Sequence, residues 1–242
     1  MQNVSKVFWT GTAIAQLAVA GLQAAGTVYQ LDNGIVSYPL NAADGTEPLD
    51  TWFANEFTAQ PNGNVIASVA FFLSSASPSY PADVVIYKET SPLSFARIYT
   101  QAFTPQAGTP IGYTVQSITL NTPVQLNVGD NFLVAIFMQD VIAQPPNDKY
   151  PFTLDTSGVA AGSFWDRSAP GTFNLDDLSG AVPVDQNIAG GSWNPGPGHL
   201  MIRAFSAVVP EPSVLGLGGL AAAGAALAWR RRRSSSGGKS QI

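Results

Sequence analysis

The residues able to do acid–base or metal chemistry are few in this chain of 242 residues. There is no cysteine, and His199 is the single histidine. A serine hydrolase site needs further partners, and no Gly-x-Ser-x-Gly elbow occurs. A zinc site would have to use ligands other than His and Cys, which zinc disfavours. His199 is therefore interpreted as a residue at the start of the last strand.

Paired carboxylates are the other route to hydrolysis. Glycoside hydrolysis needs two carboxyl groups at a set separation. The body holds only three glutamates, Glu47, Glu56 and Glu89, and no aspartate pair is marked by its surroundings. We predict no catalytic residue and a non-enzymatic protein. A hydrolase is the alternative that a cleft with two facing carboxylates would support.

Calcium is a separate question, because it takes oxygen ligands. Asp176 and Asp177 are adjacent carboxylates in a loop-like stretch, although no EF-hand pattern occurs. The two readings are a structural calcium at this pair and ordinary solvated loop carboxylates. No other cofactor is predicted.

Two tryptophans stand beside polar residues in loop-like stretches. Trp165 precedes Asp166, and Trp193 precedes Asn194 within a run rich in Gly and Pro. An aromatic ring stacks on the apolar face of a sugar while polar neighbours fix its hydroxyls. These four residues are the candidate glycan contacts. The alternative is that both rings close the ends of the core.

Charge in the body is strongly one-sided. Residues 27–208 contain 5 basic and 15 acidic residues, which leaves a net charge of -10. An acidic surface repels the phosphate backbone. Nucleic acid is therefore excluded as a partner.

The elements that must position these residues have the pattern of strands. Turn residues separate the apolar or alternating runs, and no stretch shows a capped 3.6-residue period. The runs are 52–57, 65–73, 84–87, 113–120, 132–138 and 199–205, with turns at 61–64, 78–81, 128–131 and 145–148. Strands without intervening helices predict an all-β domain over 27–208, an antiparallel β-sandwich.

The first 26 residues have the layout of a secretory leader. Lys6 is followed by an apolar run to about Val19, and small residues offer cleavage after Ala20 or after Gly26. Residues 1–26 are therefore predicted to be a signal peptide with a leader helix. An ordinary N-terminal helix is the alternative, but such a helix would carry charges on one face.

The other end has three parts in order. Val209, Pro210, Glu211 and Pro212 precede an apolar segment over 214–229, and Arg230, Arg231, Arg232 and Arg233 follow it. A helix of 16 residues is roughly 24 Å long, which is short for a bilayer core of about 30 Å. The sequence predicts a short transmembrane helix with the arginines as a cytoplasmic stop-transfer signal. Residues 234–242 form a polar tail.

These three parts resemble the PEP-CTERM sorting signal over residues 209–233. The resemblance implies that exosortase, an integral-membrane enzyme, recognises the Pro-Glu-Pro segment. It implies a precursor anchored in the inner membrane, then transfer to the cell surface or the extracellular polysaccharide matrix. The tail after the arginines departs from the usual pattern, and a plain membrane anchor is the alternative.

The body has a second, looser resemblance over about residues 50–206. The segments 64–69, 83–87, 118–134, 162–166 and 200–204 are similar in order to jelly-roll modules of secreted bacterial proteins, whose layout is that of carbohydrate-binding modules. This implies a jelly-roll-like sandwich. It also supplies the alternative function, a module that binds extracellular polysaccharide.

Overall fold

The computed structural model describes residues 26–36, 38–40, 48–74, 81–105, 113–141, 152–157, 161–185 and 198–207. The chain forms two compact units, and one of them, Ala25–Val209, contains every described residue. The predicted leader helix and the predicted membrane helix lie outside the described residues. Within the described part there is no helix with the length and apolarity needed to cross a membrane.

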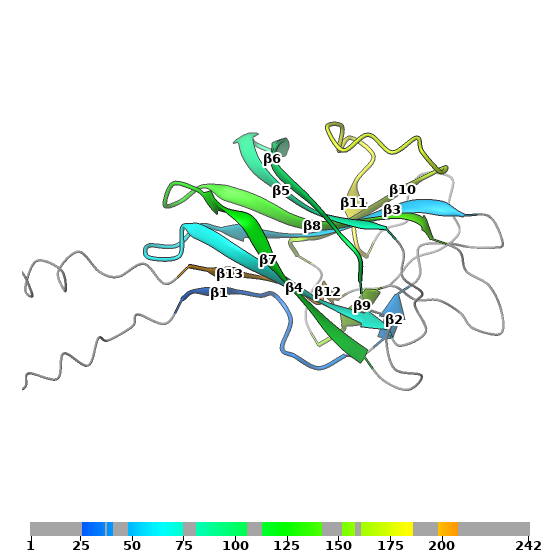
Figure 1. Ribbon diagram of the computed structural model, residues 1–242, viewed down its shortest axis with the longest axis horizontal. Coiled ribbons are helices and arrows are strands. Elements are labelled where there is room, and N and C mark those ends of the chain that lie inside the picture. The colour runs from blue at the N-terminus through cyan, green and yellow to red at the C-terminus, as the bar shows by residue number, and fades with distance from the viewer. Residues whose placement is uncertain are drawn as a thin grey trace, which may run out of the picture. The chain divides into compact units, whose positions relative to one another are not determined.

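The described residues form antiparallel strands only, thirteen in all, arranged in layers (Figure 1). Their bounds are Val28–Tyr29 (β1), Tyr38–Leu40 (β2), Leu49–Thr58 (β3), Val65–Ser74 (β4), Ala82–Ser91 (β5), Ser94–Phe103 (β6), Tyr113–Gln125 (β7), Asn131–Val141 (β8), Phe152–Asp155 (β9), Ser163–Ser168 (β10), Val182–Pro183 (β11), His199–Leu200 (β12) and Ile202–Ser206 (β13). The predicted all-β antiparallel class is confirmed.

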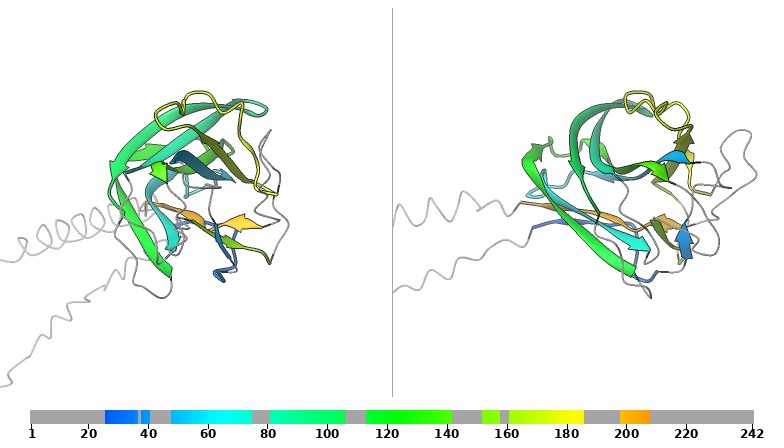
Figure 2. Two further views of the ribbon diagram at one scale, coloured as in Figure 1. Left: turned by 90° about the vertical axis from the view of Figure 1, so that its right-hand side faces the viewer. Right: turned by 45° about the vertical axis from the view of Figure 1, so that its right-hand side comes forward.

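Two larger sheets make the sandwich, as the two views of Figure 2 show. One has the strand order β1-β13-β4-β7, and the other has the order β11-β10-β3-β8-β5-β6. A third, smaller sheet has the strand order β12-β9-β2. Because consecutive strands often lie in different sheets, the chain crosses repeatedly from one layer to the other.

The main core fills the space between the two larger sheets. Side chains alternate along each strand, so every second residue points inward. Phe53, Phe71, Ile86 and Ile136 are fully buried members of this core. Burying one such side chain stabilises the fold by about 1.5–3 kcal/mol. Each of the six predicted apolar runs lies on strands that the structure contains.

A second core covers the outer face of the six-stranded sheet. It contains Trp52, Tyr87, Leu133 and Phe137, each nearly or fully buried. The segment between β10 and β11, residues 169–181, packs over them and arches across the top right of Figure 1. We call this segment the cover. It explains why residues 132–138 are buried without alternation, since this strand is covered on both faces.

Two tight turns follow the predicted chemistry. Asn62 has a φ of 62° in the turn between β3 and β4, and Gly129 has a φ of 90° in the turn before β8. Asparagine and glycine tolerate this left-handed region best. The predicted turn at 145–148 and all but the last residue of the predicted turn at 78–81 lie outside the described residues.

Strand β6 was missed by the sequence patterns. It is an edge strand, and most of its residues are exposed, so it has no apolar run. Its side chains instead link the two sheets. The amide N–H of Asn121 donates to the Tyr99 hydroxyl at 3.0 Å and to Gln101 Oε1 at 2.8 Å. These bonds close one side of the sandwich.

Candidate functional site

Trp165 lies in the core and is not exposed. Its side chain has no accessible surface, and its ring stacks on Phe53 with centroids 6.4 Å apart and planes 18° apart. The Arg167 guanidinium lies 5.8 Å from the ring centroid. β10 aims Trp165 inward because the residue occupies an inward position of the alternation. The expectation of an exposed stacking platform at Trp165 is therefore wrong, and this ring belongs to the core.

Asp166 points to the opposite face and is covered. It is 9% exposed, and a Cβ built on Gly180 of the cover would come within 2.8 Å of its Oδ2. Burial raises the pKa of the Asp166 carboxyl, the N–H that Arg167 donates lowers it in part, and the charge of Asp177 raises it further. Asp166 is thus packed beneath the cover instead of facing a ligand. Trp193 and Asn194 lie outside the described residues.

The carboxylates considered for calcium lie on the cover and have other contacts. Asp176 Oδ2 accepts from Arg97 Nη2 at 2.8 Å, and Asp177 Oδ1 accepts from the N–H of Ser179 at 3.0 Å. The Ser179 groups lower the pKa of Asp177. Among the described residues no group of three or more His, Asp or Glu side chains is placed to hold a metal ion. Nothing in this part of the chain adds ligands to the pair.

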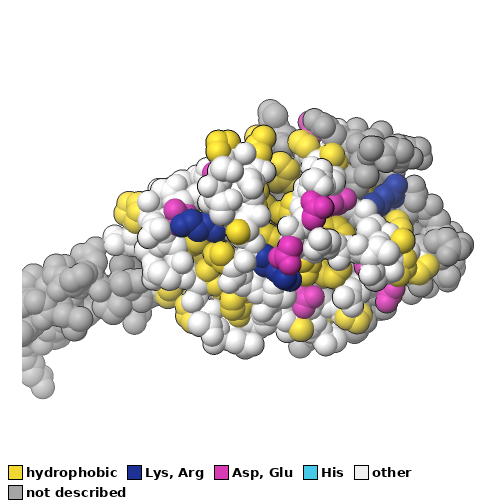
Figure 3. All heavy atoms as spheres, turned by 90° about the horizontal axis from the view of Figure 1, so that it is seen from above, with side chains coloured by type: hydrophobic (Ala, Val, Ile, Leu, Met, Phe, Trp, Pro, Cys, Tyr) yellow, Lys and Arg dark blue, Asp and Glu magenta, His cyan; other side chains and the backbone are white. Residues whose placement is uncertain are grey.

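Some of the charged side chains of this face occur in pairs. Figure 3 shows basic and acidic groups side by side with apolar side chains between them. Besides Arg97 and Asp176, Lys88 Nζ lies 2.7 Å from Asp130 Oδ2. The acidic excess of the body is therefore not gathered into one binding patch on the face in view.

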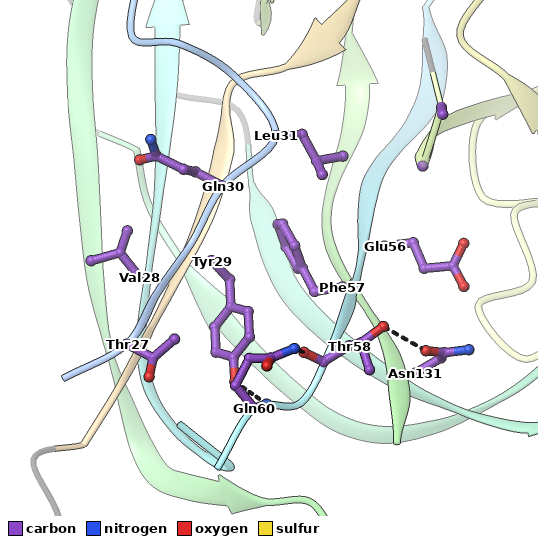
Figure 4. Close-up of a pocket in the computed structure, with 12 residues that line it drawn as sticks. Thr27, Val28, Tyr29, Gln30, Leu31, Glu56, Phe57, Thr58, Gln60 and Asn131 are labelled. Carbon is purple, nitrogen blue, oxygen red and sulfur yellow. Dashed lines mark hydrogen bonds between the residues drawn. The ribbon is translucent and has the colours of Figure 1, made fainter. Parts of the chain in front are cut away.

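A polar cleft lies where β1 faces the end of β3, and it is the best candidate site among the described residues (Figure 4). Its volume is about 590 Å³. Residues of β1, β3 and β8 line it, with others just after β1 and β3 and just before β10. They include Gln30, Glu56, Thr58, Gln60 and Asn131. Amide, hydroxyl and carboxylate groups of this kind bind the hydroxyls of polar ligands.

Hydrogen bonds hold the cleft in shape. Tyr29 Oη donates to the carbonyl of Gly63 at 3.1 Å and accepts from the N–H of Gln60 at 2.8 Å. Thr58 Oγ1 donates to Asn131 Oδ1 at 2.8 Å. Figure 4 places Glu56 and Asn131 on one side of the cleft, with the Tyr29 ring between them and Thr27. The ring is 6% exposed, so it offers little stacking surface.

Glu56 is the electrostatically distinct group of the cleft. Burial raises its pKa first, and the neighbouring charge of Glu89 raises it further. Glu89 itself accepts a hydrogen bond from Asn131 Nδ2 at 2.7 Å. The sequence patterns did not predict this site, because its residues come from strands that are distant in the chain. The one local signal was the change to outward polar residues, Glu56 and Thr58, at the end of an apolar strand.

A second hollow lies at the border of the cover. It has a volume of about 350 Å³ and is mostly apolar. Trp52, Leu93, Phe95, Phe164 and Leu178 are among the residues that line it. Leu93 is 86% exposed at the hairpin between β5 and β6. This hollow is a gap in the packing of the second core, and the residues that line it carry no charge.

Comparison with known proteins identifies one feature. Residues 208–233 match the PEP-CTERM protein-sorting motif. No curated protein and no solved structure matches the chain. The matched residues cover the predicted sorting segment, the apolar segment and the arginines, which all lie outside the described residues.

Proposed function

We infer that the chain, which carries a PEP-CTERM sorting motif, is an exported protein that exosortase processes and that is anchored only transiently in the membrane. From this premise we propose that it is a non-enzymatic component of the cell surface or of the extracellular polysaccharide matrix. The leader would direct the body out of the cytoplasm, and the precursor would wait in the inner membrane. The observation that carries this proposal is the complete three-part motif at 208–233.

Each part of the motif has a physical role in the proposal. Pro210 and Pro212 cannot continue a helix and favour an extended backbone, the form that a protease binds. The apolar segment 214–229 holds that backbone near the membrane surface. The charges of Arg230–Arg233 stop translocation. Cleavage near the Pro-Glu-Pro segment would then release the body.

The non-enzymatic reading is supported by how the buried carboxylates are used. Asp32 pairs with Arg203 and caps the turn at Gly34. Asp50 accepts from the N–H groups of Asp140 and Gly171 at 3.2 and 2.8 Å. These carboxylates are occupied in holding loops to strands. A hydrolase would need two of them to face one substrate.

We describe the body as a jelly roll on the basis of its strand order. One sheet has the order β1-β13-β4-β7, and the other contains the order β3-β8-β5-β6. These two strand orders together are the pattern of two interlocked Greek keys. β10 and β11 extend the second sheet beyond β3. This description agrees with the family layout of secreted modules, although fold by itself assigns no ligand.

The test of the sorting proposal is the mass of the mature protein. Glu211→Ala, or deletion of Arg230–Arg233, should leave the precursor in the inner membrane fraction. Lys239→Ala, which changes a basic residue of the tail, is the matched control and should be processed normally. If the mature wild-type protein still contains Arg230–Arg233, a plain anchor is the correct interpretation.

The alternative function is binding of extracellular polysaccharide, and the polar cleft supports it. Glu56 has acceptor oxygens in a cleft of about 590 Å³ that has room for a sugar ring. The net charge of -10 favours a neutral glycan, since an anionic one would need calcium as a bridge. Trp193 and Asn194 stay candidates as well. Binding at one site would be weak, and many copies would supply avidity.

Retention on extracted extracellular polysaccharide, with and without chelator, tests this alternative. Glu56→Gln and Trp193→Ala should each reduce retention. Asp140→Asn is the control, because it changes an exposed carboxylate at the other end of β8 from the cleft. Equal retention of all three variants would leave the protein with a purely structural role.

A further inference from the structure

The end of the described body is fixed into the sandwich up to its last residue. The N–H of Ser206 donates to the carbonyl of Thr27 at 2.9 Å, and the N–H of Thr27 donates to Ser206 Oγ at 2.7 Å. The N–H of Ala207 donates to the carbonyl of Val65 at 2.7 Å. The sorting motif begins at residue 208. No free linker therefore separates the sandwich from the motif.

The covalent chain sets a short upper limit on the distance to the Pro-Glu-Pro segment. Only two residues, Val208 and Val209, stand between Ala207 and Pro210. Consecutive Cα atoms are about 3.8 Å apart, so the Cα of Pro210 is at most about 11 Å from that of Ala207. An enzyme that binds the backbone at Pro210 must meet the surface of the folded body around Ala207.

That surface is made by two turns, residues 60–64 and 126–130, which we call the exit face. Val65, the partner of Ala207, directly follows the first turn. The turns are bonded to each other, since the N–H of Leu126 donates to the carbonyl of Asn64 at 2.8 Å. Figure 1 shows both turns at the end of the sandwich where β1 begins and β13 ends.

Backbone hydrogen bonds hold the two turns of the exit face together. The N–H of Gly129 donates to the carbonyl of Ala59, and the N–H of Ala59 donates to the carbonyl of Asp130, both at 2.8 Å. The N–H of Asn127 donates to Asp130 Oδ2 at 2.7 Å. Because these groups are already paired, a partner can bind the face without rearranging it.

The chemistry of the exit face favours a protein over lipid headgroups. Four of its ten residues are uncharged amides and one is charged; Val128 is 55% exposed, and the charge of Asp130 is paired with Lys88. An anionic membrane surface attracts clusters of Lys and Arg, and these two turns contribute none. The cores of protein interfaces are likewise depleted of charge.

We propose that the exit face docks on the outward surface of exosortase while the sorting motif is processed, with Val128 inside the contact. This inference rests on the proposed function and names the part of the body that the enzyme meets. The docked face positions Pro210 and its neighbours, so the enzyme recognises the folded end of the body together with the motif.

Crosslinking tests the contact directly, because the chain has no cysteine of its own. Val128→Cys and Val115→Cys would each carry a photoactivatable crosslinker, in the full-length precursor, in membranes that contain exosortase. Val115 is 52% exposed and lies on β7 near the strand end remote from the exit face, which makes it a matched control. An adduct with exosortase from position 128 alone is expected. Adducts with lipid alone, or none, would overturn the proposal.

Processing rates provide the second readout. Val128→Asp should slow cleavage roughly tenfold, because a carboxylate would lose water in the contact, whereas Val115→Asp should not. A flexible insertion of ten Gly and Ser residues after Ala207 should remove this difference, since the face then no longer has to reach the enzyme. Circular dichroism would verify that the variants fold. Absence of wild-type cleavage would refute the sorting proposal itself, whereas normal cleavage of Val128→Asp would refute only the docking of the exit face.

Discussion

Asn55 shows how a single buried amide joins three parts of the chain. Its Nδ2 donates to the carbonyls of Leu200 and Ile202 at 2.7 and 2.9 Å. Its Oδ1 accepts from Ser163 Oγ at 2.7 Å, and that hydroxyl accepts from the N–H of Leu200 at 3.2 Å. The side chain is fully buried, so no water can replace these partners. The amide therefore ties β3 to β10 and to the last strands.

Asn55→Ala is expected to lower the free energy of unfolding by about 2–4 kcal/mol, because it leaves buried carbonyls and a hydroxyl without partners. Denaturant unfolding of the purified body would measure the change. Asn33→Ala is the control, since Asn33 is exposed and its side chain bonds on the surface, to Ser157 Oγ and to the N–H of Ile35, where water can replace it. Equal effects of the two substitutions would contradict the role assigned to Asn55.

Asp155 couples stability to pH. Burial by itself would raise its pKa, but the N–H groups of Asn33 and Ser157, at 2.6 and 2.9 Å, together with the nearby His199, hold the pKa below the ordinary value of 3.8. A carboxyl with a lowered folded-state pKa stabilises the fold at pH values above its unfolded pKa. This contribution is lost as the pH falls through the folded value.

The unfolding free energy of the wild-type body is therefore expected to fall more steeply below pH 4 than that of Asp155→Asn. The unfolding free energies of the wild type and of Asp155→Asn must be subtracted at each pH. Glu56, Asp83 and Asp166 have raised pKa values, so they change the stability of both proteins with pH in the opposite direction. Unfolding curves at pH 7, 5, 4 and 3 would supply it. Parallel curves for the two proteins would show that Asp155 is not responsible.

At the scale of the elements, the cover converts one face of a sheet into a second core. Trp52 and Phe137 point away from the main core, and an uncovered sheet would expose them. Phe173 of the cover packs on Phe137 with ring centroids 5.1 Å apart, and Leu175 and Leu178 pack on the same cluster. Strands buried on both faces tolerate no alternation of polar residues. The cover is therefore part of the fold.

Phe173→Ala should destabilise the body by about 1–2 kcal/mol, since the side chain is half-buried and a fully buried one contributes about 1.5–3 kcal/mol. It should also increase the binding of a hydrophobic dye, because Phe137 and its neighbours become accessible. Thr172→Ala, at the exposed neighbouring position, is the control. Unchanged dye binding would mean that the rest of the cover closes the face without Phe173.

At the scale of the whole molecule, the first and last strands hold each other. β1 pairs with β13 through Val28 and Phe205, which are separated by almost the whole body. Tyr29 of β1 packs on Phe57 and Phe132 with ring centroids 5.7 and 5.3 Å apart. Such long-range pairing forms late, because loop closure costs entropy before the contacts stabilise it. The sandwich can thus be completed only when the segment next to the sorting motif has been made.

Residues 26–208 alone are expected to fold and to give a circular dichroism spectrum of β-structure with little helix. Removal of residues 26–30 should lower the midpoint of thermal unfolding, because the Tyr29 ring and its bonds to Gln60 and Gly63 are lost. A helical spectrum of the longer fragment would contradict the described fold. An unchanged midpoint of the shorter fragment would show that β1 adds no stability.

The sequence by itself determined the features that rest on contiguous residues. The order Pro210, Glu211, Pro212, apolar segment and arginines is a linear signal, and comparison with known proteins matched it. The strands at 65–73 and 132–138 were likewise visible, because a buried strand needs a local run of apolar residues. The turn at Asn62 was predictable, since few residues tolerate a positive φ.

Only the tertiary structure decided which side chains face solvent and which meet. Trp165 has polar neighbours in the sequence, yet the alternation of β10 and its pairing with β3 turn the ring into the core against Phe53. The polar cleft and the cover depend on strands distant in the chain, so no local pattern could indicate them. Exposure and proximity are set by packing between sheets, and that packing is a property of the whole fold.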